Sequence, residues 1–257
     1  MNAPLLQVSG LTKNYGSTPA CNDISFALHP GEVIAIVGES GSGKSTLLRC
    51  ISGQMEPSSG AVAYTHADGR VTDLFAASEA ERRNLMRKDW GFVHQDARDG
   101  LRMGVSAGAN IGESLMAVGS RHYGKIRASA EDWLSRVEIA ASRIDDSPWS
   151  YSGGMRQRLQ IARNLVTAPR LVFMDEPTGG LDVSVQARLL DLIRGLVRNM
   201  KLAAVVVTHD LAVARLLSSR MMVMQNGRVV ETGLTDQVLE DPQAPYTQLL
   251  VASVLQA

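Results

Sequence analysis

The chain has 257 residues, 45% of them hydrophobic, and its 26 basic residues balance its 26 acidic ones. This length and composition predict one domain, or two small ones, with a packed core. A net charge of zero argues against a dedicated nucleic-acid binder, and no hydrophobic run reaches the length of a membrane span. Cys21 and Cys50 form neither a metal-ligand spacing nor a disulfide framework, and no secretory signal is recognised, so we expect a cytoplasmic protein.

The N-terminal part of the chain alternates between strands and turns. Hydrophobic patterns predict strands at residues 5–11, 21–28, 33–37 and 61–64. A turn is expected at residues 13–16, between the first two strands, and Asp68-Gly69 indicates a further hairpin.

A glycine-rich stretch follows the hydrophobic run at residues 33–37 and leads into residues with helical spacing. It matches G-x-x-x-x-G-K-[ST] in the strand–loop–helix context of a phosphate-binding loop. Glycines let successive N–H groups surround an anion, and the helix start adds its positive dipole end. A turn of glycine and serine that binds no ligand would not need a lysine and a serine at the start of the helix. In a phosphate-binding loop, Lys44 would contact the phosphates and Ser45 would bind Mg²⁺. The predicted phosphate-binding residues are Gly38, Ser40, Gly41, Ser42, Gly43, Lys44, Ser45 and Thr46.

The middle of the chain is predominantly helical. Residues 78–88 predict a charged helix with a solvated face, and residues 90–95 a short strand that ends on Gln95. Residues 96–112 are rich in Gly, Ala and Asp and give no clear pattern. Helical patterns follow within residues 113–144, and another helix begins at Ser152-Gly153-Gly154.

In the C-terminal part of the chain, strands and helices are again predicted to alternate. Buried strands are predicted at residues 171–174 and 203–207, with an amphipathic helix between them. Asn226-Gly227 indicates a hairpin between residues 221–224 and 228–231. Short hydrophobic strands that alternate with helices predict an α/β fold with a mostly parallel sheet.

Two acidic residues follow the strand at residues 171–174. Open α/β sheets bind ligands at the carboxyl ends of their strands. Asp175 is therefore placed to hold Mg²⁺, directly or through water, and Glu176 to polarise an attacking water. The alternative interpretation is an acidic pair that caps a helix.

Six motifs follow one another along the chain, namely the phosphate loop, Gln95, residues 151–155, residues 173–177, Leu181-Asp182 and His209. Together, in this order, they resemble the nucleotide-binding domain of ATP-binding cassette (ABC) ATPases. The resemblance covers nearly the whole chain. It implies a P-loop NTPase (RecA-like) core, an N-terminal antiparallel β subdomain and an inserted α-helical subdomain. The single domain would then comprise a core at residues 1–95 and 167–257 and a helical subdomain at residues 96–166.

The resemblance also implies roles for individual residues in binding ATP and Mg²⁺. Tyr15 would stack on adenine, His209 would contact the γ-phosphate, and Asp182 would help shape the opposing site. Two copies would pack head to tail around two ATP molecules and separate after hydrolysis. The turn that faces the partner's γ-phosphate would be Ser152, Gly153 and Gly154. The catalytic residues would be Glu176, Gln95 and His209, and the Mg²⁺ ligands Ser45, Gln95 and Asp175.

Some positions depart from the family pattern. Tyr151 and Met155 replace the first and last residues of Leu-Ser-Gly-Gly-Gln, and Gly179-Gly180 stands where Ser-Ala or Thr-Ala is commoner. Every catalytic position is intact, so we expect active hydrolysis.

Similarity outside the motifs indicates the partner. Residues 241–250 resemble the tails of oligopeptide- and nickel-type importer ATPases, whereas residues 94–110 and 177–186 resemble the ABC subunits of bacterial carbon–phosphorus lyase systems. Importers usually carry a Pro-Met-Thr-Ser-Leu-Asn-Pro-like segment after the glutamine, where membrane subunits dock. The first hypothesis is therefore an ATPase that docks on the lyase core through its radical iron–sulfur subunit. The second hypothesis is an importer subunit for phosphonates or small peptides. The third is a DNA-repair or chromosome ATPase, but this chain lacks the long insertions expected of such ATPases.

Overall fold

The computed structural model describes residues 3–255 and divides the chain into two compact units. The first unit consists of Met1–Arg82 and Lys201–Ala257, and the second of Arg83–Met200. The chain passes from the first unit to the second within α2 (Glu79–Lys88), the predicted charged helix. Among the described residues, none of the helices combines the length and hydrophobicity that a membrane span requires.

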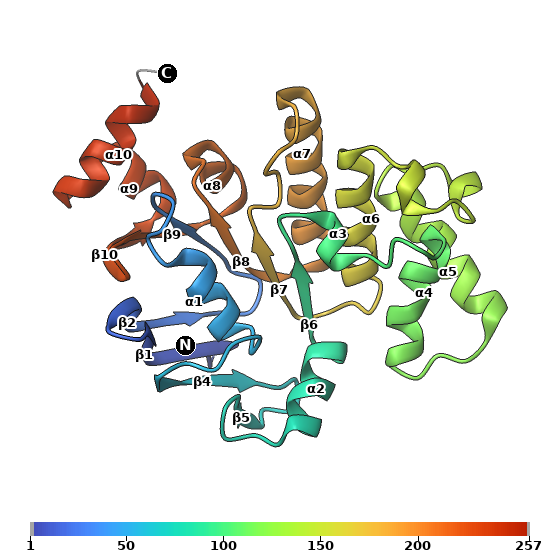
Figure 1. Ribbon diagram of the computed structural model, residues 1–257, viewed down its shortest axis with the longest axis horizontal. Helices are drawn as coiled ribbons and strands as arrows, with labels where there is room; N and C mark the ends of the chain where they lie inside the picture. Colours follow the sequence, from blue (N-terminus) through green and yellow to red (C-terminus); the bar gives the residue numbers. More distant parts are fainter. Residues whose placement is uncertain (1–2, 256–257) are drawn as a thin grey trace. The chain divides into compact units, whose positions relative to one another are not determined.

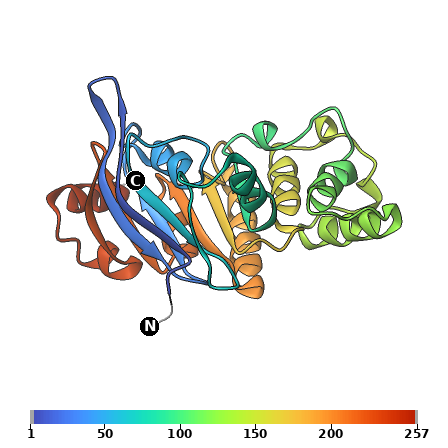
Figure 2. The same cartoon turned by 90° about the horizontal axis from the view of Figure 1, so that it is seen from below.

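The first unit begins with an antiparallel sheet in the order β2-β1-β4-β5. Its strands are β1 (Leu6–Tyr15), β2 (Thr18–Leu28), β4 (Ser59–Thr65) and β5 (Val71–Asp73). The turn expected at residues 13–16 is wrong in extent, because Lys13 still pairs with Cys21 and Tyr15 with Thr18. Gly16, with φ of +60°, allows a tighter turn, and Figure 2 shows the resulting long blue hairpin.

A second sheet in this unit carries the predicted phosphate loop. It contains β3 (Val33–Val37), β8 (Ala203–Thr208), β9 (Arg220–Gln225) and β10 (Arg228–Leu234). β3 pairs in parallel with both β8 and β9, whereas β9 and β10 form the predicted antiparallel hairpin. Every residue of β3 and β8 is buried, as expected of parallel strands covered on both faces. The mostly parallel core and the N-terminal antiparallel sheet are therefore confirmed.

Helices of the first unit flank these strands (Figure 1). They are α1 (Lys44–Ile51), α8 (Leu211–Leu217), α9 (Thr235–Glu240) and α10 (Pro245–Leu255). Sequence patterns predicted α1 but not the last three. α8 and α9 have only seven and six residues, too few for a clear helical period.

The second unit contains a parallel pair of strands and a group of helices. Its elements are β6 (Trp90–Val93), α3 (Ala97–Gly100), α4 (Ala107–Ala117), α5 (Tyr123–Arg136), η1 (Ala141–Arg143), η2 (Pro148–Ser150), α6 (Gly153–Leu165), β7 (Leu171–Asp175) and α7 (Val183–Met200). α4 packs against both α5 and α6 (Figure 1). The unassigned residues 96–112 form α3 and the start of α4, where Asp96 and Ser106 accept hydrogen bonds as N-caps.

Candidate nucleotide-binding site

The loop between β3 and α1 depends on glycines that lie against neighbouring backbone. Gly38 and Gly43 have φ of +148° and +102°. A Cβ atom on Gly38 would lie 2.2 Å from the carbonyl oxygen of Met224, and one on Gly43 would lie 2.0 Å from that of Ala20. Both positions therefore need glycine for conformation and for space.

Lys44 lies inside this loop rather than in solvent. Its side chain is buried, and Nζ donates to the carbonyl oxygens of Gly38 at 2.7 Å and Glu39 at 2.8 Å. These bonds link the first turn of α1 to the start of the loop. The lysine consequently holds a positive charge at the centre of the loop, where an anion would be stabilised.

The loop has further features that fit a phosphate group. The buried Oγ of Ser42 has no hydrogen-bond partner among the described residues. Gly43 begins α1 without a side-chain cap, and the first turn of α1 contains no acidic residue. A helix N-terminus without a side-chain cap, an unpaired buried hydroxyl and a lysine together form an anion site. The residues present therefore fit the phosphate groups of a bound nucleoside triphosphate.

His209 is brought to the phosphate loop by strand register. Val37 pairs with Thr208 in the parallel β3–β8 ladder, so Gly38 and His209 are the next residues on adjacent strands. The His209 side chain is exposed. Both residues thus lie at the carboxyl edge of the sheet, where open α/β sheets bind ligands.

Tyr15 ends β1 with an exposed ring. Its side chain is 53% exposed, and its Oη lies 3.1 Å from Sδ of Met55. The Nζ of Lys13 lies 5.8 Å from the ring centroid. Ala20, on the other strand of the same hairpin, lies close to Gly43 of the phosphate loop, since a Cβ atom on Gly43 would meet its carbonyl oxygen. An exposed aromatic ring can stack on a planar base.

In the second unit, Asp175 and Glu176 lie at the carboxyl end of β7. Asp175 is buried, and Glu176 has φ of +44°, a left-handed conformation that is uncommon for glutamate. The N–H of Gly179 donates to the carbonyl oxygen of Glu176 at 2.9 Å and closes the turn. Such backbone strain is concentrated at functional sites, which makes this turn a candidate for one.

Gln95 lies against the same turn. A Cβ atom on Gly179 would lie 3.3 Å from both Cγ and Nε2 of Gln95 and 3.2 Å from the carbonyl oxygen of Glu176. Gly179, which departs from the family pattern, therefore leaves space for the Gln95 side chain. Sequence reasoning did not identify this role, and the departure itself was the only available signal.

The predicted turn at Ser152 begins α6. Ser152 is its N-cap, with Oγ accepting from the N–H of Met155 at 3.3 Å, and Ser152 and Gly153 are both exposed. Gly154 is buried, and a Cβ atom there would lie 2.5 Å from Cγ1 of Val185 on α7. The helix thus presents an open N-terminus that could bind an anion. The remaining predicted residue, Asp182, is exposed, and its carbonyl oxygen accepts from Val185 at the start of α7.

Tyr151 and Met155, which depart from the family pattern on either side of this turn, both contact Arg143. Tyr151 is buried, its Oη donates to the carbonyl oxygen of Arg143 at 2.8 Å, and its ring lies 4.6 Å from the Arg143 guanidinium carbon. The Sδ of Met155 lies 3.5 Å from Nη1 of Arg143. Burial raises the pKa of the Tyr151 hydroxyl, although the Arg143 charge opposes this shift. Tyr151 and Met155 therefore pack around Arg143 and leave Ser152 exposed.

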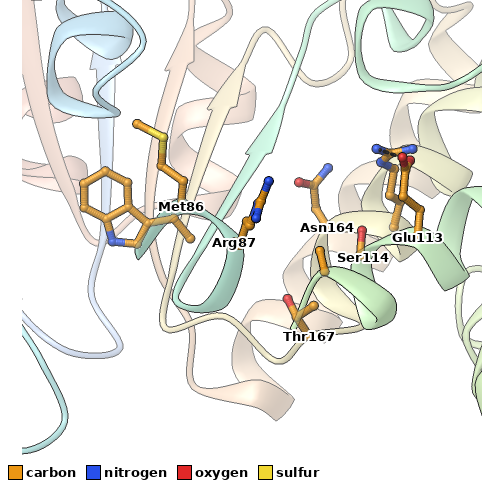
Figure 3. Close-up of a pocket in the computed structure, with 9 residues that line it drawn as sticks. Met86, Arg87, Glu113, Ser114, Asn164 and Thr167 are labelled. Carbon is orange, nitrogen blue, oxygen red and sulfur yellow. Dashed lines mark ion pairs between the residues drawn. The ribbon is translucent and has the colours of Figure 1, made fainter. Parts of the chain in front are cut away.

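A pocket elsewhere in the second unit does not contain the predicted site. It has a volume of about 320 Å³ and includes Glu113, which forms ion pairs with Arg163 at 2.9 Å and Arg102 at 3.0 Å. None of its lining residues belongs to the phosphate loop or to the turn at Asp175 and Glu176. Its lining residues, several of them labelled in Figure 3, are Met86, Arg87, Trp90, Glu113, Ser114, Ala117, Arg163, Asn164 and Thr167.

The strands, the phosphate loop and the acidic turn define a P-loop NTPase. Residues 21–179 match the ABC transporter family model, and the chain belongs to this family of ATPases. It is 64% identical over 256 residues to the putative phosphonates utilization ATP-binding protein PhnK of Escherichia coli K12, with all of both chains covered. It is also 36% identical to the dipeptide transport ATP-binding protein DppD of Bacillus subtilis, over 93% of this chain and 72% of that protein.

Solved structures agree with this assignment. The dimeric ATP-binding cassette MJ0796, bound to ADP and Pi in a post-hydrolysis state, is 28% identical with a TM-score of 0.78 and covers 90% of this chain and 98% of that chain. The cassette cbiO1 from Clostridium perfringens is 29% identical with a TM-score of 0.80 and covers 93% and 92%. The predicted family, fold class and ATPase activity are therefore confirmed.

Proposed function

We propose that this chain is the ATP-hydrolysing ABC subunit of a carbon–phosphorus lyase complex in phosphonate breakdown. The observation that carries the proposal is the 64% identity to the phosphonates utilization protein over the full length of both chains. The peptide-import relatives are 36 to 37% identical over 92 to 98% of this chain. The higher identity favours the lyase system over an importer.

The site residues would bind ATP, which supplies the phosphoanhydride bond that is cleaved, together with Mg²⁺, which would neutralise phosphate charge. Lys44 would balance the phosphate charge, and Tyr15 would stack on adenine. The oxygens of Ser45, Gln95 and Asp175 are the hard ligands that Mg²⁺ prefers.

Glu176 would orient the attacking water and accept its proton. Its placement at the end of a buried strand, in a strained turn beside Gln95, supports this role. His209 would hydrogen-bond to the γ-phosphate, and its register position beside Gly38 supports this contact.

A second copy of the chain would complete each site. Its Ser152, Gly153 and Gly154 would bind the γ-phosphate through N–H groups at the start of α6, while Asp182 would shape the opposing site. The exposed Ser152 and Gly153 support this arrangement, as does the dimeric state of the MJ0796 cassette. Loss of the γ-phosphate contacts after hydrolysis would let the copies separate and so remodel the lyase core.

Affinity purification tests the proposed partner. The tagged chain is expressed in cells that use a phosphonate as their phosphorus source, and captured proteins are identified with and without ATP. We expect lyase core subunits, including the radical iron–sulfur subunit. Recovery of an integral membrane permease without lyase subunits would instead support the importer function.

A further inference from the structure

The C-terminal helix contacts the phosphate loop through one hydrogen bond. The backbone N–H of Glu39 donates to the Oη of Tyr246 on α10 at 3.0 Å, although 207 positions separate the two residues. Glu39 is the second residue of the loop, and its carbonyl oxygen accepts from Nζ of Lys44 at 2.8 Å. Glu39 is therefore held at its N–H by α10 and at its carbonyl by the lysine of the loop.

The Tyr246 ring is anchored by the core beneath the loop. Tyr246, Leu250 and Val251 pack in the first unit against a buried cluster that includes Val37, the last residue of β3, and Val223 of β9. The strand that leads into the phosphate loop thus also supports the tyrosine. Because the ring is packed, its hydroxyl reaches the loop without first losing much rotamer freedom.

The turn before α10 is also fixed. The Glu231 carboxylate on β10 accepts hydrogen bonds from the N–H groups of Gln243 at 2.8 Å and Ala244 at 3.0 Å. Burial opposes ionisation of Glu231, but hydrogen bonds, including those from these amides, outweigh it and lower the pKa of the carboxyl group. A charged acceptor therefore holds the chain where α10 begins.

We propose that Tyr246 is a positioning residue for ATP, because it holds the Glu39 end of the phosphate loop in its binding conformation. A loop rich in glycine loses much conformational freedom when it closes on a ligand. Restraining one peptide group beforehand reduces that cost and raises affinity. This role depends on ATP binding at the loop and is independent of the proposed lyase partner. It places the C-terminal segment at the ATP site.

The Tyr246→Phe substitution tests the role because it removes the hydroxyl and keeps the ring. Loss of one neutral hydrogen bond predicts about a two- to tenfold rise in the Kd and KM for MgATP. The kcat stays within about twofold, because the loop affects ground and transition states alike. Binding of inorganic pyrophosphate weakens by the same factor as MgATP, whereas binding of adenosine does not change.

Two comparisons make the test decisive. Leu249→Ala removes an exposed side chain from the same helix and should leave Kd and KM unchanged. Thermal unfolding of nucleotide-free Tyr246→Phe shows whether its fold is intact. Wild-type affinity for MgATP and pyrophosphate in Tyr246→Phe would overturn the proposal and leave the hydroxyl a purely structural role. An equal loss of adenosine binding would also overturn it, because the effect would then extend beyond the phosphate loop.

Discussion

Gln160 on α6 holds the backbone of His94, the residue directly before Gln95. Its Oε1 accepts from the His94 N–H at 2.6 Å, and its Nε2 donates to the His94 carbonyl oxygen at 3.1 Å. Gln157 donates to the same carbonyl oxygen at 3.1 Å. These contacts explain why β6 ends at Val93, before the predicted end of the strand. They also link Gln95 to the helix that begins at Ser152.

We expect Gln160→Leu to destabilise the fold. The variant would remove the Gln160 Oε1 acceptor from the part-buried bond to the His94 N–H, and a lost hydrogen bond of this kind costs about 0.5–1.5 kcal/mol. Urea denaturation measures this loss in the free energy of unfolding. The exposed Gln237→Ala on α9 serves as a control and should change stability by less than about 0.5 kcal/mol. Equal stability of Gln160→Leu and wild type would show that the glutamine does not support the strand end.

Lys44→Ala should weaken ATP binding strongly. The substitution removes the charge and the bonds to the carbonyl oxygens of Gly38 and Glu39. A hydrogen bond to a charged group is worth about 1.5–3 kcal/mol, which predicts roughly a 10- to 100-fold higher Kd. Isothermal titration calorimetry with MgATP measures the change. A Kd within about twofold of wild type would exclude the lysine from phosphate binding.

The buried thiols should be unreactive in the folded chain. Burial raises the pKa of Cys21 to about 12 and that of Cys50 to about 11, from an ordinary value of 9.0. Thiolates are therefore scarce at about pH 8, and a disulfide reagent should label neither cysteine until the chain is unfolded in guanidinium. Rapid labelling of the native chain would contradict this assignment.

The same pKa shifts predict a loss of stability in alkali. The folded pKa values lie above the ordinary one, so the neutral buried thiols stabilise the fold fully below pH 9.0. That contribution is lost as the pH rises towards 11 and 12. Serine at both positions should reduce the alkaline dependence of the free energy of unfolding.

We propose that residues 96–110 contribute to docking on the lyase core. Arg98 is 59% exposed, and its hydrogen bond to the Asp96 side chain lowers the pKa of that carboxyl to about 2. Arginine often dominates interface energy, so Arg98→Ala should reduce lyase co-purification by about tenfold and leave ATP hydrolysis unchanged. Arg136→Ala, on the exposed face of α5, is the matched control. Equal capture by both variants would remove Arg98 from the interface.

Local sequence signals were sufficient to predict most of the strands and the phosphate loop. The run Val33–Val37 is hydrophobic throughout, and the glycines, Lys44 and Ser45 follow at fixed spacing, so few alternatives remain. The Asn226-Gly227 pair predicted its hairpin equally clearly, because Asn-Gly favours a turn with positive φ at both residues. The structure shows positive φ at both.

Long-range contacts could not be predicted in the same way. Gln160 and His94 are 66 positions apart, and no sequence period connects a polar side chain to one distant peptide group. Tyr151 and Met155 looked like losses from a motif, whereas the structure shows that both pack on Arg143. The short helix α8 is stabilised by the Asp210 cap and by tertiary packing, whereas α9 has no side-chain N-cap and depends on packing.

The central claim is that two copies of the chain enclose two ATP molecules, and the mass of Glu176→Gln in solution tests it most directly. Removal of the carboxylate base should slow hydrolysis by about 100-fold or more and preserve the ATP-bound state. Light scattering should then show a dimer with MgATP and a monomer without it. Adding Ser152→Arg should keep the chain monomeric while it still binds ATP. A Glu176→Gln chain that stays monomeric with ATP bound, or dimerises equally well with Ser152→Arg, would contradict the claim.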